Sequence, residues 1–339
     1  MRRLCFLLLL LGGLCLAACS SEPGDTGRHT ASKPPAVKPQ TLTFNGGPQG
    51  GTFNYFANKM AAIISEDIPG LDVLARESDG SVENLLALCE GRADMGIVNA
   101  GDAFLGRIGK LSCVEKKYAD VQALAFLYGA PAQLVVRADS DIHTVLDLRG
   151  KTIAVGNPGS GAALSAERFL RHLKLWNQIR HRPVGYAEAA EDFAEGSVDG
   201  FWTLAGSPNA AVMEASSAVP VRILDLHEAA TVSGFYQLYP FYSQAVIPAG
   251  TYDGQAGPVS TFQDSALWCA RTGLDADTTY AALSAVFSEA RLNELRRTHR
   301  AAREMSVKNG IRNLSIPLHP GAVRFWAEKR LSIPPILMP

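Results

Sequence analysis

From residue 41 onward, short apolar runs alternate with segments in which apolar residues recur every three or four positions. The apolar runs cover residues 41–45, 71–76 and 95–99, and each has the length of a strand. The segments between them place apolar residues on one helical face, as in Phe53, Phe56, Met60, Ile63 and Ile64. The third helix is expected to bury Phe104, Leu105 and Ile108. This alternation predicts a parallel, doubly wound α/β sheet.

The same pattern begins again after two further extended runs at residues 121–128 and 133–137. Strands are expected at 152–156, 199–203 and 221–226, and helices at 162–173 and 209–217. The chain then returns through an extended segment at 246–248, followed by a strand at 266–270 and helices over 278–288 and 292–305. We expect two α/β lobes, the first made of residues 41–137 and 248–339 and the second of 138–247. The two crossings would act as a two-segment hinge.

Five of the expected strands end in turns rich in Gly, Ser and Asn. These turns cover residues 45–52, 78–84, 99–102, 156–161 and 205–209. The first N–H groups of a helix have no intrahelical acceptor and carry the positive end of the helix dipole, so converging helix N-termini form an anion site. Any one of these turns could simply cap its helix. Their repetition at one edge of the sheet favours a binding cleft.

Composition and charge narrow the function. The chain has 339 residues, 47% of them hydrophobic, and a net charge of -1, with no long run of Lys or Arg. This excludes a typical nucleic-acid-binding protein. No Cys-x-x-Cys pair, zinc-type His spacing, phosphate-binding Gly-x-x-x-x-Gly-Lys-Ser/Thr or Gly-x-Ser-x-Gly motif occurs. We therefore expect that the protein binds no metal ion or cofactor and that it is not an enzyme.

The N-terminus has the pattern of an export signal. Met1-Arg2-Arg3 precedes an apolar run at residues 4–11, and Leu16-Ala17-Ala18-Cys19 resembles a bacterial lipobox. That resemblance implies removal of residues 1–18 and lipidation of Cys19, which would anchor the protein to a membrane outside the cytoplasm. An ordinary cleaved signal with an incidental cysteine is the alternative. Residues 19–40 contain few apolar side chains and predict a flexible tether.

Three cysteines remain beyond the signal and the anchor, namely Cys89, Cys113 and Cys269. An extracytoplasmic location permits a disulfide between Cys89 and Cys113. Cys89 also falls on the apolar face of an expected helix, where it would be a small core residue with a free thiol. The sequence leaves both outcomes open.

An ordered set of short motifs resembles the TAXI family of TRAP-transporter solute receptors over residues 41–328. The motifs are Gly50-Gly51-Thr52, Ser78-x-Gly80-Ser81-Val82-Glu83-Asn84, Gly91-Arg92-Ala93-Asp94-Met95, Asp147-Leu148-Arg149-Gly150-Lys151, Gly156-x-Pro158-Gly159-Ser160-Gly161, Asp199-Gly200-Phe201, Ala205-Gly206-x-Pro208 and Ile316-Pro317-Leu318-His319-Pro320-Gly321-Ala322. The resemblance implies a type II periplasmic-binding-protein fold and a monomeric, non-catalytic receptor. It would capture a small organic anion, such as a glutamate-like amino acid or a 2-oxo or dicarboxylic acid, and deliver it to a sodium-driven permease.

The resemblance also implies roles for residues of the first lobe. Gly51 and Thr52 would offer N–H groups and a hydroxyl to the ligand. The family usually continues with two tyrosines, whereas this chain has Phe53-Asn54-Tyr55, so a ring hydroxyl is lost at Phe53. Ser81 would donate to a ligand carboxylate, with Asn84 one turn further on; the alternative for Ser81 is helix capping.

Further ligand-binding residues are expected on three other turns. Ser160 and Gly161 would form a carboxylate nest in the second lobe, next to Ala162 where the family often has Thr. Asn99 and Asp102 could bind a ligand amine, although Asp102 could equally cap its own helix. Ala205, Gly206 and Pro208 would form the edge of the second lobe. Tyr242 is expected near the return crossing, and His319 is expected to start the last helix.

Two other functions are compatible with an exported protein of this fold. The same fold serves receptors of ABC importers and ligand-sensing lipoproteins, and the two-lobed pattern alone does not separate them. A purely structural surface lipoprotein is disfavoured, because five polar turns would leave N–H groups without partners.

Overall fold

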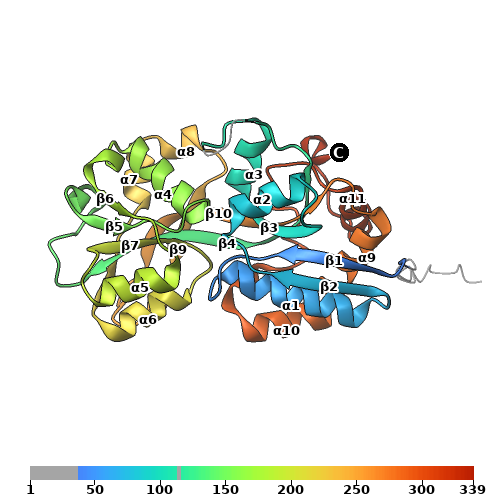
Figure 1. Ribbon diagram of the computed structural model, residues 1–339, viewed down its shortest axis with the longest axis horizontal. Coiled ribbons are helices and arrows are strands. Elements are labelled where there is room, and N and C mark those ends of the chain that lie inside the picture. The colour runs from blue at the N-terminus through green and yellow to red at the C-terminus, as the bar shows by residue number, and fades with distance from the viewer. Residues whose placement is uncertain (1–36, 113–115) are drawn as a thin grey trace, which may run out of the picture. The chain divides into compact units, whose positions relative to one another are not determined.

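The computed structural model describes residues 37–112 and 116–339. Within these residues the chain forms one ten-stranded mixed sheet with helices on both faces (Figure 1). This confirms the expected α/β class. The signal segment, Cys19, the tether up to residue 36 and Cys113 lie outside the described residues.

The strands follow one another across the sheet in the order β2-β1-β3-β10-β4-β7-β5-β6, with β8 pairing to β4 and β9 to β10. Their bounds are β1 Gln40–Asn45, β2 Leu71–Arg76, β3 Met95–Asn99, β4 Val121–Arg137, β5 Thr152–Ala154, β6 Arg180–Arg182, β7 Gly200–Leu204, β8 Val221–Ile223, β9 Ser243–Ile247 and β10 Val259–Arg271. We call β1, β2, β3 and β10 the first half of the sheet, and β5, β6, β7 and β8 the second half.

The first half begins as the alternation predicts. Strand β1 pairs in parallel with both β2 and β3. All five residues of β3 are buried, as expected for a strand with neighbours on both sides and helices above and below. The sequence pattern did not predict which strand comes next in the sheet. Strand β10 lies between β3 and β4 and runs antiparallel to both.

Strand β4 joins the two halves. The two extended runs expected at 121–128 and 133–137 are one strand of 17 residues. Its first part pairs with β10 as far as Pro131, and from Ala132 onward it pairs with β7 and β8. A proline cannot donate to a strand ladder but fits extended backbone. Pro131 therefore interrupts the sequence pattern without breaking the strand, because it stands where β4 changes neighbours.

Eleven helices of the α type occur among the described residues. They are α1 Thr52–Asp67, α2 Ser81–Cys89, α3 Ala100–Arg107, α4 Gly161–His172, α5 Tyr186–Ala194, α6 Ala210–Ala218, α7 His227–Val232, α8 Phe235–Leu238, α9 Ala276–Val286, α10 Glu289–Thr298 and α11 Pro320–Glu328. The helix expected at 292–305 is divided at His299, whose extended backbone ends α10 and whose side chain caps the next turn. His319 caps α11 through its ring nitrogen, which confirms its structural role.

Helix α3 packs differently from its expected orientation. It buries its small residues and Asp102, while Phe104 and Leu105 are half-buried and Ile108 is exposed. Small side chains let α3 approach β10 and the segment around Phe241 closely, since a β-carbon on Gly101 would stand 2.5 Å from the Phe241 ring. The predicted apolar face was therefore wrong for this helix.

The second half is covered on both faces. Helices α5 and α6 pack on one face, where Phe193, Phe201 and Val212 belong to a separate buried cluster. On the other face, α4 brings Phe169 against Trp202 and Phe262. The contact with Trp202 packs α4 on β7, and the contact with Phe262 joins it to the first part of β10.

Two further features concern the rest of the described chain. No helix in residues 37–112 and 116–339 is long and apolar enough to span a membrane, and no cluster of His, Cys, Asp or Glu there could hold a metal ion. Cys89 is half-buried and carries a free thiol, and its burial raises the pKa of that thiol to about 11. Its expected partner, Cys113, lies outside the described residues.

Candidate functional site

A small cavity lies at the carboxyl ends of the parallel strands, where the five turns meet. Its volume is about 40 Å³. The lining residues come from all five turns and from the start of α5; they are Pro48, Gly51, Thr52, Phe53, Asp79, Gly80, Ser81, Asn99, Asn157, Ser160, Gly161, Ala162, Tyr186, Leu204 and Ala205. The cavity therefore draws on both halves of the sheet, which is the usual place for a ligand in an open α/β sheet.

Three helices point their N-termini at this cavity. Helices α1 and α2 begin after Gly51 and Gly80, and neither glycine offers a side chain to cap the helix. Helix α4 begins after Ser160, whose Oγ accepts from the Ala163 N–H and leaves those of Gly161 and Ala162 uncapped by it. Among the described residues, no Lys, Arg or His lines the cavity, and Asp79 is the only charged residue that does. An anion bound here would be held by backbone N–H groups and helix dipoles.

Ser81 is the first residue of α2, not its cap. Its Oγ accepts a hydrogen bond of 2.8 Å from the backbone N–H of Asn99. This bond ties the start of α2 to the end of β3 and leaves the hydroxyl hydrogen of Ser81 to point elsewhere. Because Ser81 is buried and lines the cavity, a bound anion is a suitable acceptor for that hydrogen.

Gly161 lies in close contact with the first half of the sheet. A β-carbon there would stand 2.1 Å from Asn99 Nδ2 and 2.9 Å from both Asp102 Oδ2 and Ser81 Cβ. Only glycine permits the N-terminus of α4 to reach the first half at this distance. Asn99 is buried, and its Oδ1 has no hydrogen-bond partner among the described residues. This orphan acceptor at the cavity wall suits a ligand N–H or O–H group.

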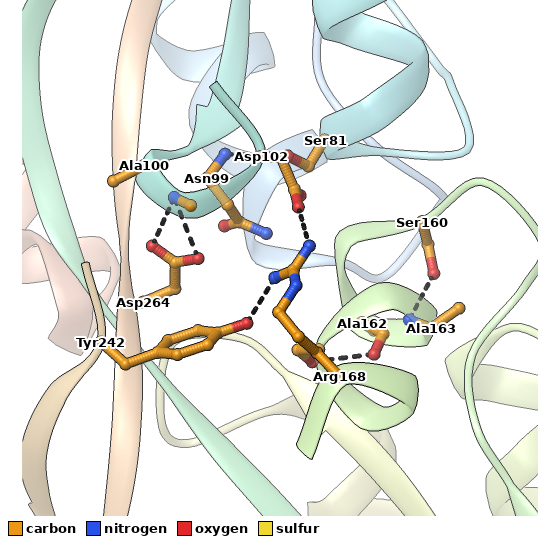
Figure 2. A network of polar contacts seen from close by, with 12 residues as sticks. Ser81, Asn99, Ala100, Asp102, Ser160, Ala162, Ala163, Arg168, Tyr242 and Asp264 are labelled. Atoms are coloured by element: carbon orange, nitrogen blue, oxygen red, sulfur yellow. Dashed lines mark hydrogen bonds and ion pairs between the residues drawn. The ribbon is translucent and has the colours of Figure 1, made fainter. Parts of the chain in front are cut away.

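Asp102 lies beside the cavity but does not line it. Its Oδ1 accepts from Arg168 of α4 at 3.1 Å, and its Oδ2 has no partner in the described chain. The same guanidinium donates to the Tyr242 hydroxyl at 2.6 Å (Figure 2). Asp102 does not cap α3, whose N-cap residue is Asn99. Arg168 therefore occupies one oxygen of the Asp102 carboxylate, and only Oδ2 is available to another partner.

Asp264 completes this network from β10. It accepts from the backbone N–H groups of Gly101 and Ser265, and it is buried. Burial, and then repulsion by the charge of Asp102, raises the pKa of Asp264 to about 7. The carboxyl therefore titrates near neutral pH.

Besides Asp102, four expected binding residues lie away from the cavity lining. Asn84 is fully buried and donates to the carbonyl groups of Gly46 and Ile97, so it braces the first turn against β3. A β-carbon on Gly206 would stand 3.0 Å from Ala301, so Gly206 packs against the first half. Tyr55 and Pro208 line a neighbouring groove and not the cavity.

That groove has a volume of about 550 Å³ and shares Gly51 and Thr52 with the cavity. Its walls come from α1, from the end of α10 and from the start of α6. Of the residues that the structure describes, Lys59 and Arg300 are the basic ones in this lining, and none of the lining residues is acidic. A ligand too large for the cavity can extend into this groove.

Sequence reasoning missed several lining residues. Asp79 and Asn157 lie within turns that the pattern identified, and they meet across the halves through a bond of 3.1 Å from Asn157 Nδ2 to Asp79 Oδ1. Tyr186 lies outside the five turns, so the sequence pattern did not indicate it. Its hydroxyl donates to the carbonyl of Leu204 at 3.1 Å, and burial raises the pKa of Tyr186 to about 12. Tyr186 reaches the cavity at the start of α5, where its hydroxyl also accepts from the N–H of Leu204 at the end of β7.

Comparison with known proteins gives a family and a fold. The sequence model of the NMT1-like family matches residues 44–329. Among solved structures, the alkanesulfonate-binding protein SsuA from Xanthomonas axonopodis pv. citri, bound to MOPS, is similar with a TM-score of 0.51 and 18% identity, over 86% of this chain and 85% of that chain. This similarity shows that the chain has the fold of periplasmic solute-binding proteins.

Two other solved structures are similar at a lower level. The periplasmic aliphatic sulphonate binding protein SsuA from Escherichia coli has a TM-score of 0.42 and 17% identity, covering 86% of this chain and 84% of that one. The ligand-binding component of an ABC-type import system from Staphylococcus aureus has a TM-score of 0.46 and 12% identity, covering 84% of each chain.

Proposed function

This chain belongs to the NMT1-like family, and we propose that it is an extracytoplasmic solute-binding receptor that captures a small organic anion. One observation carries the proposal. The N-termini of α1, α2 and α4 converge on a cavity that no basic side chain of residues 37–112 or 116–339 lines. Such a site attracts a carboxylate through backbone dipoles and provides no nucleophile and base pair for catalysis.

Binding would proceed by closure of two lobes, residues 41–137 with 248–339 and residues 138–247. The cavity takes Thr52, Ser81 and Asn99 from the first lobe, and Ser160 and Gly161 from the second. A ligand between them gains contacts with both lobes only when they meet, so it selects the closed state. Strand β4 passes from one half of the sheet to the other and is one hinge segment in this proposal.

The ligand class that fits best is a glutamate-like amino acid or a 2-oxo or dicarboxylic acid. One carboxylate would occupy the N–H groups of Gly161 and Ala162 and the Ser81 hydroxyl. The unpartnered Asn99 Oδ1 would accept from an ammonium or hydroxyl group of the ligand. The cavity has room for only a few atoms beyond the acid group, so the remainder would extend toward the groove that shares Thr52.

A membrane permease would receive the ligand. The resemblance to TAXI receptors supports a sodium-driven TRAP-type permease. The similarity to the ligand-binding component of an ABC-type import system motivates an ABC importer as the second candidate. Uptake by membrane vesicles that contain the cognate permease separates the two, because the first requires a sodium gradient and the second requires ATP.

A thermal-shift screen tests the ligand class. The protein is scanned with L-glutamate, L-glutamine, 2-oxoglutarate, succinate, taurine and neutral amino acids. A ligand present at about 1,000 times its dissociation constant adds roughly 4 kcal/mol to the free energy of unfolding. A shift with a carboxylate supports the proposal, and a shift with taurine alone would replace carboxylate by sulfonate. If none shifts, denaturation followed by mass spectrometry decides whether a ligand was already bound.

A further inference from the structure

We infer that the ion pair between Asp102 and Arg168 is a closure latch, which maintains a closed population without ligand and sets ligand affinity from outside the binding cavity. This inference rests on the proposed receptor function, since it assumes that the two halves separate. It names a device for regulating the same site. Neither residue lines the cavity.

The pair crosses from one half of the sheet to the other. Asp102 lies on α3, which packs on β3 and β10 of the first half, and Arg168 lies on α4, which packs on β7 of the second half. Arg168 Nη2 stands 3.1 Å from Asp102 Oδ1, and the two side chains are only 9% and 1% exposed. Figure 2 shows the two groups pointing toward one another. Separation of α3 from α4 must break this contact.

Each partner is positioned by its own surroundings. On one side, the Arg168 guanidinium donates to the Tyr242 hydroxyl, whose ring packs on Phe235 and Phe262. On the other side, Asp264 holds the backbone N–H of Gly101, next to Asp102. The guanidinium and the carboxylate are therefore already oriented, so that closure requires little rearrangement of either side chain.

The energetic argument concerns what happens when one partner is missing. In an open state both charges are hydrated, and closure removes their water. That cost is repaid only if the opposite charge is in place. Without Arg168, closure would bury the Asp102 carboxylate close to Asp264 with no cation. The closed fraction would fall, and the apparent affinity for any ligand would fall by the same factor.

The pair therefore differs from a contact with the ligand. A residue that binds the ligand changes affinity in a ligand-dependent way and does not alter the ligand-free equilibrium. A latch changes the ligand-free equilibrium itself and reduces the affinity for every ligand equally. The closed population without ligand is thus the quantity to measure.

The test uses the full chain with spin labels on p-acetylphenylalanine, which replaces Lys59 on α1 and Met213 on α6. Both residues line opposite sides of the groove between the halves and are exposed. Distance distributions from pulsed dipolar spectroscopy are compared for the unmutated latch, Arg168→Gln, Asp102→Asn and the double variant. The matched control is Arg171→Gln, which removes an exposed ion pair with Glu167 on the same helix. L-glutamate is the probe for calorimetry.

We expect a short-distance population in the ligand-free protein. Arg168→Gln and Asp102→Asn should each deplete it and weaken binding about tenfold or more. The double variant buries no unpaired charge and should recover most of both losses, and Arg171→Gln should change neither. Thermal denaturation verifies that each variant folds.

Three results would overturn the latch. They are a ligand-free protein with only long distances, an Arg168→Gln variant with an unchanged distribution, and a double variant as impaired as the single ones. If the unmutated protein does not bind L-glutamate, that amino acid is excluded as the ligand and the thermal-shift screen decides the rest of the proposed class. The distance measurements then still decide the latch by themselves.

Discussion

A β-carbon on Gly161 would stand 2.1 Å from the side-chain nitrogen of Asn99, so the start of α4 and the end of β3 meet at a distance that only glycine allows. The contact joins the two halves of the sheet beside the cavity. It also lies next to the Asp102–Arg168 ion pair, since the same β-carbon would stand 2.9 Å from Asp102 Oδ2. The halves can therefore close fully only when this position has no side chain.

Replacement of Gly161 by alanine should weaken ligand binding at least about tenfold, or about 1.4 kcal/mol, because the added methyl group holds the halves apart. The ligand-free protein should lose no stability, since alanine is the better helix former at the first position of α4. Calorimetry and thermal denaturation measure the two effects. Gly185→Ala is the control, because a β-carbon there meets open space at the start of α5. Equal binding by both variants would contradict this role for Gly161.

Ser81→Ala should affect folding as well as binding. The substitution leaves the buried N–H of Asn99 without its acceptor, which costs about 1–3 kcal/mol of unfolding free energy. Loss of a donor to the ligand should cost a similar amount of affinity. Urea unfolding without ligand and calorimetry separate these losses. Ser217→Ala, on the exposed side of α6, should change neither quantity. An unchanged affinity in Ser81→Ala would remove Ser81 from the binding site.

Ser160→Ala should mainly destabilise α4. Ser160 Oγ caps this helix through the Ala163 N–H, and loss of such a cap costs about 0.5–2 kcal/mol. Binding should weaken as well, because the cap shapes the turn that presents Gly161 and Ala162. If the carboxylate binds there, the crystal structure of a complex should place an acid oxygen within hydrogen-bond distance of these two N–H groups.

Asp264 should make stability depend on pH. Its pKa is raised from 3.8 to about 7, and the charged groups Asp102 and Arg168 and the Tyr242 hydroxyl face it. Between these two values the folded chain holds a proton that the unfolded chain has lost. The contribution of Asp264 is therefore greatest at low pH, falls by about 1.4 kcal/mol per pH unit across this window, and is constant above it.

Asp264→Asn tests this dependence. The variant should show a flatter curve of unfolding free energy against pH than the unmutated protein, with the difference concentrated between pH 4 and about 7. Asp139→Asn, at an exposed carboxylate, is the control. Parallel curves for Asp264→Asn and the unmutated protein would mean that this carboxyl does not titrate in the window.

The N-terminal anchor remains a prediction from the lipobox-like Leu16-Ala17-Ala18-Cys19. Mass spectrometry of the mature protein should find Cys19 at the N-terminus with acyl chains attached. Cys19→Ala should release the protein from membranes during fractionation. An unmodified thiol at Cys19 would reject the anchor and leave an ordinary signal peptide.

The sequence alone determined the local elements and the turns between them. Strands β2 and β3 and helices α1 and α2 follow from side-chain periodicity, which depends only on neighbouring residues. Gly, Ser and Asn at strand ends identify the turns for a similar local reason, and parallel strands must end at a common edge. Hence the sequence alone locates the five turns of the cavity.

Only the tertiary structure decided which residues meet across the cavity. Strand β10 inserts between β3 and β4 from more than 120 positions away, and its pairing leaves no local sequence signal. The buried face of α3 depends on the approach of Phe241, so Asp102 faces Arg168 and not solvent. Asp102 and Arg168 are 66 positions apart in the sequence. Their salt bridge depends on how α3 and α4 pack, and that packing exists only in the assembled sheet.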